Sequence, residues 1–225
     1  MNHMPYLNRT QIIKLIKNKQ IYSNKSLNKN QIQPASIDLT LSHKCYRIKA
    51  SFIPNNIKIS KIISKLSLSK INLNQNQLLE KNCIYLCELN EKLNLPHDIM
   101  GKSNPKSTTG RLDIFTRVIT ENGQEYDNVN YNYSGKLYLE IIPQSFSIII
   151  KKNISLNQLR FFQGSNIEDK INQISISVSI KRNQLTAYKA KKITSAINLS
   201  KTNFYESDKY WEKIIPKDNY FIIER

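Results

Sequence analysis

The sequence predicts a mainly β fold, either a barrel or a sandwich, and three observations support this prediction. Short apolar runs with polar residues at alternate positions recur along the chain, turn residues such as Pro96, Pro143 and Gly164 separate them, and a helical pattern lies at the start. Many short strands joined by turns are typical of barrels and sandwiches. With 225 residues, 40% of them hydrophobic, the chain can bury the core of one good-sized domain or two small ones.

The first part of the chain is expected to hold a short helix, a loop and a strand. Asn8 and Gln11 have the spacing of a capping box, and apolar residues three and four apart follow them. The Asn-, Lys- and Ser-rich residues 18–30 favour a loop, and residues 33–41 end in the two-residue alternation of a strand. Residues 55–78 have low complexity, and their pattern does not distinguish helix from strand.

Strand patterns dominate the rest of the chain. The clearest lies at residues 174–180, where every second residue is apolar, as in a half-buried strand. Residues 137–142 alternate too, and this places Glu140 on the same face as Tyr138 and Ile142. Further strands are expected at residues 83–89, 145–150, 158–162 and 218–224.

The end of the chain repeats a pattern from its interior. Residues 218–224 resemble residues 82–88, which begin an interior strand. Two interpretations are open: the chain is half of a duplicated protein, or this segment is an ordinary C-terminal strand. We expect one domain over residues 1–200, followed over residues 201–225 by a linker and the first strand of a missing second repeat.

The chain is strongly basic, with 34 Lys and Arg against 17 Asp and Glu, a net charge of +17. Such a charge often marks a partner that is nucleic acid or another polyanion. The excess lies in residues 1–80 and 151–200, whereas residues 101–150 hold equal numbers of basic and acidic side chains. Most basic residues are Lys, and Asn and Ile are abundant, so a compositional bias is the main interpretation. Arg clusters interleaved with aromatic residues are missing, and we do not expect a nucleic-acid partner.

Several classes of protein are excluded by missing patterns. No apolar run is long enough to span a membrane, and residues 1–6 lack the basic and apolar segments of a secretory signal, so we expect a cytoplasmic protein without membrane contact. No glycine-rich nucleotide fingerprint occurs. Cys45, Cys83 and Cys87 form no Cys-x-x-Cys pair and no His-x-Glu precedes them, so the zinc-deaminase signature is absent. We expect buried thiols and no metal site.

Two places in the charge-balanced segment could carry chemistry. Residues 103–111 combine Pro, three successive hydroxyl groups and a Gly with Lys106 and Arg111, a composition that suits either a polyphosphate-binding turn or a polar surface loop. Glu140 lies within an apolar strand. A carboxylate there is either partly desolvated and suited to take a proton from water, or exposed on an edge strand. The residues alone leave both alternatives open.

Four segments, taken in order, resemble motifs of the dCTP deaminase family, which is related to the trimeric dUTPases. They are Gln33-Pro-Ala-Ser-Ile-Asp-Leu39, Lys106-Ser-Thr-Thr-Gly-Arg-Leu112, Tyr133-Ser-Gly-Lys-Leu-Tyr-Leu-Glu140 and Asn157-Gln-Leu-Arg-Phe161. Their order and spacing hold across residues 7–164. The stretch Asn104 to Asp113, the segment 188–192 and Trp211-Glu212 are most similar to the first half of the long, duplicated bacterial members.

The resemblance implies a fold, a reaction and roles for single residues. The fold would be the dUTPase-like distorted β-barrel, or β-clip, with a short N-terminal helix. The reaction would be zinc-independent hydrolytic deamination of dCTP to dUTP and ammonia. The dUTP would serve as a precursor of dTTP. Glu140 would activate the attacking water, and Ser107 and Arg111 would position that water, the base or the phosphates. The nucleotide-binding set would be Lys106, where many members have Arg, with Thr108, Asn130, Asp127 and Gln158, and Mg²⁺ would arrive with the triphosphate.

Two departures from the family pattern bear on function. The family's sugar-contacting Asp falls on Asn130, with Asp127 three residues earlier. Because dUTPases keep a catalytic carboxylate there, Asn130 argues against dUTP hydrolysis. The family's C-terminal tail, which grips the triphosphate, has no counterpart after residue 164.

Alternatives therefore accompany dCTP deamination. They are dUTP pyrophosphatase, a bifunctional deaminase and pyrophosphatase, and an inactive or split half of a two-domain deaminase. We expect a homotrimer or pseudo-trimeric assembly, and a split half would need a separate chain carrying the second repeat.

Overall fold

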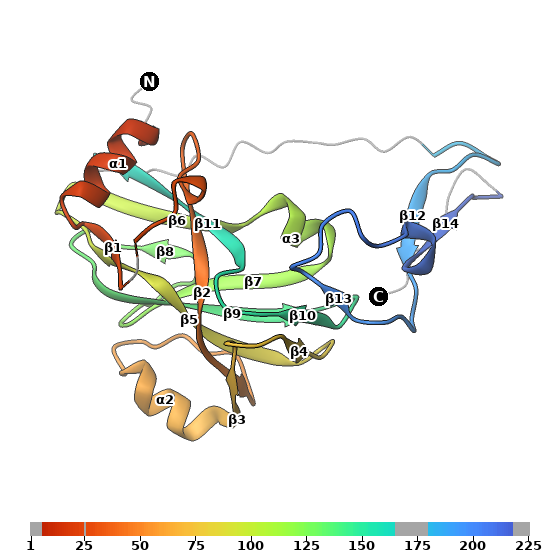
Figure 1. Cartoon of the computed structure of the whole chain (residues 1–225), viewed down its shortest axis with the longest axis horizontal. Helices are drawn as coiled ribbons and strands as arrows, with labels where there is room; N and C mark the ends of the chain where they lie inside the picture. Colours follow the sequence, from red (N-terminus) through yellow and green to blue (C-terminus); the bar gives the residue numbers. More distant parts are fainter. Residues whose placement is uncertain (1–5, 25, 165–179, 218–225) are drawn as a thin grey trace. The chain divides into compact units, whose positions relative to one another are not determined.

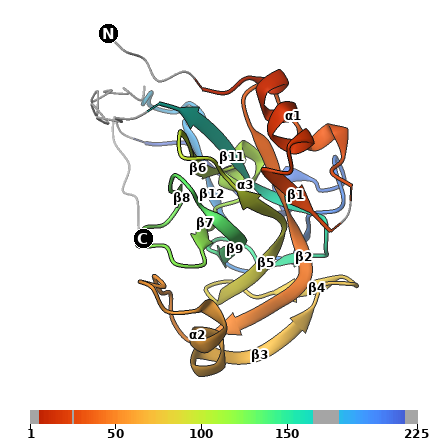
Figure 2. The same cartoon turned by 90° about the vertical axis from the view of Figure 1, so that its left-hand side faces the viewer.

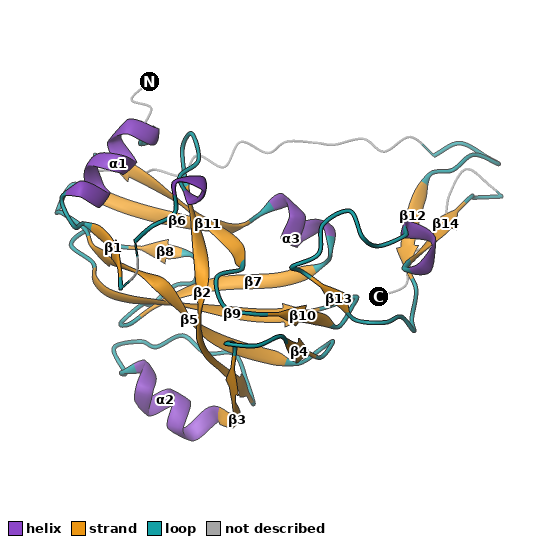
Figure 3. Ribbon diagram, viewed as in Figure 1, coloured by secondary structure: helices purple, strands orange, loops and turns teal. Residues whose placement is uncertain are grey.

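The computed structural model describes residues 6–24, 26–164 and 180–217, which form helices, short strands and loops (Figures 1 and 3). The chain divides into two compact units. The first is Met1–Asn166 with Ala196–Ser200, and the second is Ile167–Ser195 with Lys201–Arg225. The expected strands at 174–180 and 218–224 lie wholly or almost wholly outside the described residues.

The first unit holds most of the secondary structure. Its elements are α1 (Arg9–Lys17), β1 (Ile21–Ser23), η1 (Lys29–Gln31), β2 (Ile37–Ile48), α2 (Ile59–Leu66), β3 (Ser67–Asn72), β4 (Gln77–Leu79), β5 (Ile84–Asn94), β6 (Ile99–Pro105), α3 (Ser107–Arg111), β7 (Ile114–Thr120), β8 (Asn128–Val129), β9 (Ser134–Pro143), β10 (Ile148–Ile150), β11 (Ser155–Gln163) and β13 (Ile197–Asn198). The second unit contains β12 (Ala187–Ala190), η2 (Ser207–Lys209) and β14 (Trp211–Ile214), with β12 and β14 paired antiparallel.

A nine-stranded antiparallel sheet forms the body of the first unit. Its strand order is β7-β9-β5-β2-β11-β6-β8, and β1 and β3 pair with β5 and β2. The long strand β2 lies between α1 at one end and α2 at the other (Figures 1 and 2). A separate three-stranded sheet has the order β13-β10-β4. The fold is mainly β, as predicted.

Asp127 connects the two ends of this strand order. Its backbone N–H donates to the carbonyl of Val118 on β7, at 2.9 Å, and its Oδ1 accepts from the Val118 N–H, at 2.8 Å. Its own carbonyl accepts from the N–H of Ser103 on β6, at 2.8 Å. Since β7 and β6 lie toward opposite ends of the strand order, these bonds bring the sheet close to a closed barrel, which protects its edge strands.

The alternation of β9 divides its side chains between two cores. Leu137, Leu139 and Ile141 belong to the large core that extends across the sheet, whereas Tyr138 belongs to a smaller core on the opposite face. The helix α2 covers that smaller core through its fully buried Ile59. Burying a side chain of this size contributes about 1.5–3 kcal/mol. Glu140 follows Tyr138 by two residues, so it lies on the face of the smaller core.

The local predictions near the N-terminus have mixed outcomes. The capping box is confirmed: Asn8 Oδ1 accepts from the Gln11 N–H, at 3.1 Å, and Gln11 Oε1 accepts from the Asn8 N–H, at 2.9 Å. The loop expected at 18–30 is wrong in part, because it contains β1 and η1. The β1 strand is only three residues long and is stabilised by pairing with β5, which a local pattern does not reveal. The ambiguous residues 55–78 contain one helix and two strands, α2, β3 and β4.

The thiols are largely buried. Cys45 and Cys87 are opposite each other on β2 and β5 and have no exposed surface, and burial raises the pKa of Cys87 well above its usual range. Such thiols are unreactive. Cys83 is only partly buried and accepts a hydrogen bond from Arg47 Nη2, at 3.0 Å.

Candidate nucleotide site

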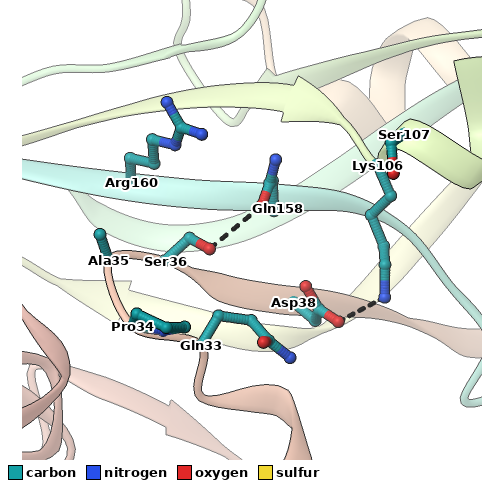
Figure 4. Close-up of a pocket in the computed structure, with 9 residues that line it drawn as sticks. All are labelled: Gln33, Pro34, Ala35, Ser36, Asp38, Lys106, Ser107, Gln158 and Arg160. Carbon is teal, nitrogen blue, oxygen red and sulfur yellow. Dashed lines mark hydrogen bonds and ion pairs between the residues drawn. The ribbon is translucent and has the colours of Figure 1, made fainter.

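A hollow of about 530 Å³ lies where β2, β11 and the start of α3 meet (Figure 4). Strand pairing explains this meeting, because β11 pairs with β2 on one side and with β6 on the other. Gln158 is therefore opposite both Asp38 and Asn104. The lining residues are Gln33, Pro34, Ala35, Ser36, Asp38, Lys106, Ser107, Gln158 and Arg160.

Two pairs of side chains interact with each other within this hollow. Lys106 Nζ forms an ion pair with the carboxylate of Asp38, which is mostly buried. The hydroxyl of Ser36 donates to Gln158 Oε1, at 3.1 Å (Figure 4). With Arg160, the hollow presents two cationic side chains, two hydroxyl groups and two amides, which are groups that can donate to phosphate oxygens.

The loop before α3 is held against β11 by two bonds to one carbonyl. The Lys106 N–H donates to the carbonyl of Leu156, at 2.8 Å, and Thr109 Oγ1 donates to the same oxygen, at 2.7 Å. These bonds fix the position of Ser107, which follows Lys106 at the edge of the hollow. Thr108 and Arg111 are exposed and do not line this hollow.

Glu140 occupies a different environment. Its side chain has no exposed surface, and β9 is flanked by β7 and β5, so the exposed edge-strand interpretation is wrong. Arg117 is its partner on β7, and Leu86 is its neighbour on β5. Arg117 Nε and Nη2 both donate to Glu140 Oε1, at 2.8 and 2.5 Å. Oε2 is buried and has no hydrogen-bond partner among the residues that the structure describes.

A second hollow, of about 420 Å³, lies beside this ion pair and is lined by Arg117, Asp127, Asp113, Phe115 and Gln144, among others. Burial raises the pKa of Asp127 from 3.8 to about 6, while the hydrogen bond from Val118 and the charge of Arg117 act to lower it. Asp127 Oδ1 is already bonded to the backbone. The hydrogen bonds of Asp127 therefore mainly join β7 to β6, although its side chain also lines this hollow.

The structure brings some predicted residues together and separates others. Lys106, Ser107 and Gln158 line the first hollow. Asp127 lines the second hollow, near Glu140, and no residue lines both hollows. Asn130 is exposed and accepts a hydrogen bond from the neighbouring Asn128, at 3.2 Å.

Sequence reasoning missed Arg160, Ser36 and Arg117 as site residues. Arg160 follows Gln158 by two positions on β11, so strand alternation alone places the two side chains on one face. Ser36 lies inside the N-terminal motif. Arg117 has no such local indication, because its proximity to Glu140 depends on the register between β7 and β9.

Within residues 6–24, 26–164 and 180–217, no three His, Cys, Asp or Glu side chains lie close enough to hold a metal ion. In the same part of the chain, every helix is too short or too polar to cross a membrane.

Comparisons with known proteins identify relatives. The model of the 2′-deoxycytidine 5′-triphosphate deaminase N-terminal domain matches residues 4–165, and that of the C-terminal domain matches residues 150–224. A crystal structure of 2′-deoxycytidine 5′-triphosphate deaminase from Agrobacterium tumefaciens is 32% identical, with a TM-score of 0.87 over 96% of this chain and 69% of that one. Comparison with curated proteins finds no match.

Weaker likenesses exist to two dUTPases. The EIAV enzyme is 15% identical with a TM-score of 0.34, over 46% of this chain and 83% of that one. A Staphylococcus bacteriophage 80alpha dUTPase variant is 12% identical with a TM-score of 0.39, over 70% of this chain and 97% of that one. The N-terminal domain model covers more than half of this chain, and the chain belongs to the dCTP deaminase family.

Proposed function

We propose that the chain deaminates dCTP by hydrolysis, giving dUTP and ammonia. Family membership supports the substrate and the reaction class. The observation that carries the proposal is Glu140, a fully buried carboxylate that is paired with Arg117 and keeps one oxygen unpartnered among the described residues. Such a group suits proton transfer, because it is desolvated and its Oε2 accepts no competing hydrogen bond from the described residues.

The proposed chemistry needs one proton acceptor and one water. The water oxygen bonds to C4 of the cytosine while Glu140 Oε2 takes a water proton. One of the two water protons then passes to N3 of the cytosine ring and the other to its amino nitrogen, the bond from C4 to that nitrogen breaks, and ammonia leaves. Glu140 ends as it began, and dCTP and water become dUTP and ammonia. No zinc is required, because the carboxylate supplies the activation that zinc supplies in other deaminases.

The first hollow is the proposed binding place for the triphosphate, which arrives as its magnesium complex. Lys106 and Arg160 provide positive charge there, and Ser107 and Gln158 provide polar contacts. The ion pair with Asp38 holds Lys106 in place, although a phosphate has to compete with that carboxylate for Nζ. We propose that Arg111, which is exposed at the end of α3, and Thr108 contact the nucleotide only in the assembled protein.

We further propose that a second copy of the chain completes each site, as in a homotrimer. The residues proposed to bind phosphate line the first hollow, whereas Arg117, the partner of the proposed base, lines the second. A site shared between neighbouring copies would bring Ser107 and Arg111 of one copy to Glu140 of the next.

The assay that tests this proposal uses the full chain with Mg²⁺ and dCTP, and it measures dUTP and ammonia together. We expect the two products in equal amounts, and much less reaction with CTP or dCMP. Size-exclusion chromatography with light scattering gives the oligomeric state of the same sample. Absence of dUTP and ammonia from a folded, trimeric sample that binds dCTP contradicts the proposal.

The same assay separates the alternatives. Release of pyrophosphate from dUTP indicates a pyrophosphatase or a bifunctional enzyme, which the exposed Asn130 in place of a carboxylate argues against. A monomer that neither binds nor converts dCTP supports an inactive or split half of a two-domain deaminase.

A further inference from the structure

The contact between Arg117 and Glu140 is asymmetric. An arginine and a carboxylate often meet as a fork, with two nitrogens on two oxygens. Here Nε and Nη2 both bond to Oε1, at 2.8 and 2.5 Å, and Oε2 stays buried without a partner among the described residues. A buried acceptor without a hydrogen bond is costly in free energy, so this arrangement needs an explanation.

Aromatic rings hold the guanidinium in this geometry. Its Cζ lies 3.7 Å from the centroid of the Tyr126 ring and 5.0 Å from that of Phe115. Cation–π contacts of this kind are favourable, and they restrict the plane of the guanidinium. The Arg117 side chain is 22% exposed, whereas that of Glu140 is fully buried. Arg117 therefore extends from the second hollow to a carboxylate that solvent does not reach.

The other ionisable groups on this face do not replace Arg117. Asp127 and Tyr126 are close enough to interact with both members of the pair, but neither supplies positive charge. On β5 the residue opposite Glu140 is Leu86, and Glu88 two positions further forms ion pairs with Lys44 and Lys136, at 3.6 and 3.2 Å. On β9 itself, Tyr138 donates to Glu121 at 2.9 Å. The packed helix α2 contributes the apolar Ile59 and Ile63.

We propose that Arg117 is a positioning residue for Glu140: by binding only Oε1 it holds the buried carboxylate in place and leaves Oε2 as the oxygen that takes the proton from water. The selection of one oxygen follows from the asymmetric contact. This inference rests on the proposed function, since it assigns the proton to Glu140.

The variants Arg117→Met and Arg117→Lys test it by kinetics. Arg117→Met removes the charge, so we expect kcat for dCTP to fall by about 30-fold or more near pH 7, while KM changes less than about threefold. Arg117→Lys keeps the charge and a donor for Oε1 without the paired nitrogens, and it should restore part of kcat.

A matched control is Arg47→Met. Arg47 forms an ion pair with Glu80, at 2.9 Å, on an exposed part of the sheet. It resembles Arg117 in being a strand arginine paired with a carboxylate, but it lines neither hollow. We expect wild-type kcat and KM in this variant. If Arg117→Met kept a wild-type kcat, the inference would be overturned.

A second measurement does not depend on turnover. Infrared spectra of protein labelled with ¹³C-carboxyl Glu, compared with the Glu140→Gln variant, isolate the Glu140 carboxylate band. We expect the position of that band to change in Arg117→Met, because Oε1 loses both of its hydrogen bonds from the guanidinium. An identical band in the two proteins overturns the inference, even if the chain does not deaminate dCTP. Failure of the proposed function would instead appear as a wild-type chain whose band depends on Arg117 but that forms no dUTP.

Discussion

Arg117 and Glu140 are opposite each other on β7 and β9, and both contacting nitrogens of the guanidinium bond to the same carboxylate oxygen. The sheet positions both residues, because neighbouring strands fix the separation of side chains that share a register position. A buried carboxylate with one oxygen held and the other unpartnered is the basis of the proposed chemistry. The predictions below test separate parts of this account.

The first prediction concerns the triphosphate. Replacing Lys106 by Met removes one of the two cations that line the first hollow. We expect KM for the magnesium complex of dCTP to rise by about tenfold and kcat to change much less. A phosphate contact stabilises the bound substrate and the transition state by similar amounts, so its loss affects mainly KM. Initial rates over a range of dCTP concentrations measure both constants. Lys151→Met, at an exposed position directly after β10, is the control, and an unchanged KM in Lys106→Met contradicts the assignment.

The second prediction concerns stability and pH at Asp127. Burial raises its pKa to about 6 in the folded chain, above its ordinary value of 3.8, so between these values the folded state binds more protons than the unfolded state. Stability therefore falls as pH rises through this window. Asp127→Asn removes the buried charge and keeps the acceptor for the Val118 N–H, so it should stabilise the fold by roughly 1–2 kcal/mol at pH 7.5 and by much less at pH 4.

Urea unfolding of wild type and Asp127→Asn at several pH values measures this effect. A stability difference that is the same at pH 7.5 and pH 4 would show that the charge of Asp127 is not responsible. Because Asp127 also lines the second hollow, the activity of this variant is a separate question from its stability.

The third prediction concerns Gly135 in β9. A Cβ at this position would lie 2.8 Å from the hydroxyl oxygen of Tyr133 and 3.2 Å from its Cζ. That hydroxyl accepts from the Glu121 N–H, at 3.0 Å, and donates to the carbonyl of Lys136. The Tyr133 ring therefore cannot move away without breaking these hydrogen bonds. We expect Gly135→Ala to lower the free energy of unfolding by about 1–3 kcal/mol.

Gly110 provides the matched control. It lies in α3, and a Cβ there meets nothing within 4 Å. Because alanine is the better helix former, Gly110→Ala should leave stability unchanged or raise it by up to about 1 kcal/mol. Thermal unfolding of the two variants gives the comparison, and equal losses in both would exclude the steric explanation.

The elements that were predicted from the sequence are those with strong local patterns. The capping box of Asn8 and Gln11, the alternation at residues 33–41 and 137–142 and the short run at 158–162 are local patterns, and the structure has the capping box and the strands β2, β9 and β11 there. The pairing of β1 with β5 was missed, because a three-residue strand has too few side chains for a periodic pattern. The structure places β1 and η1 where composition alone favoured a loop.

The residues of the candidate site likewise divide into those that the sequence indicated and those that it did not. Lys106, Ser107 and Gln158 were named from the motifs, and all three line the first hollow. For Glu140, the sequence left burial and exposure open, since the outcome depends on whether its strand is internal or at an edge. The partnership with Arg117 could not be predicted, because it depends on a register between strands.

The central claim is that Glu140 takes the proton from the attacking water, and the most direct test compares wild type with Glu140→Gln. Gln keeps the shape and the acceptor oxygen for Arg117 but does not act as a base at neutral pH. Single-turnover formation of dUTP from the magnesium complex of dCTP measures the chemical step, and equilibrium binding of dCTP shows that the site remains intact. We predict a loss of at least about 1,000-fold in that rate with dCTP affinity within about threefold of wild type. A Glu140→Gln protein that forms dUTP as fast as wild type contradicts the claim.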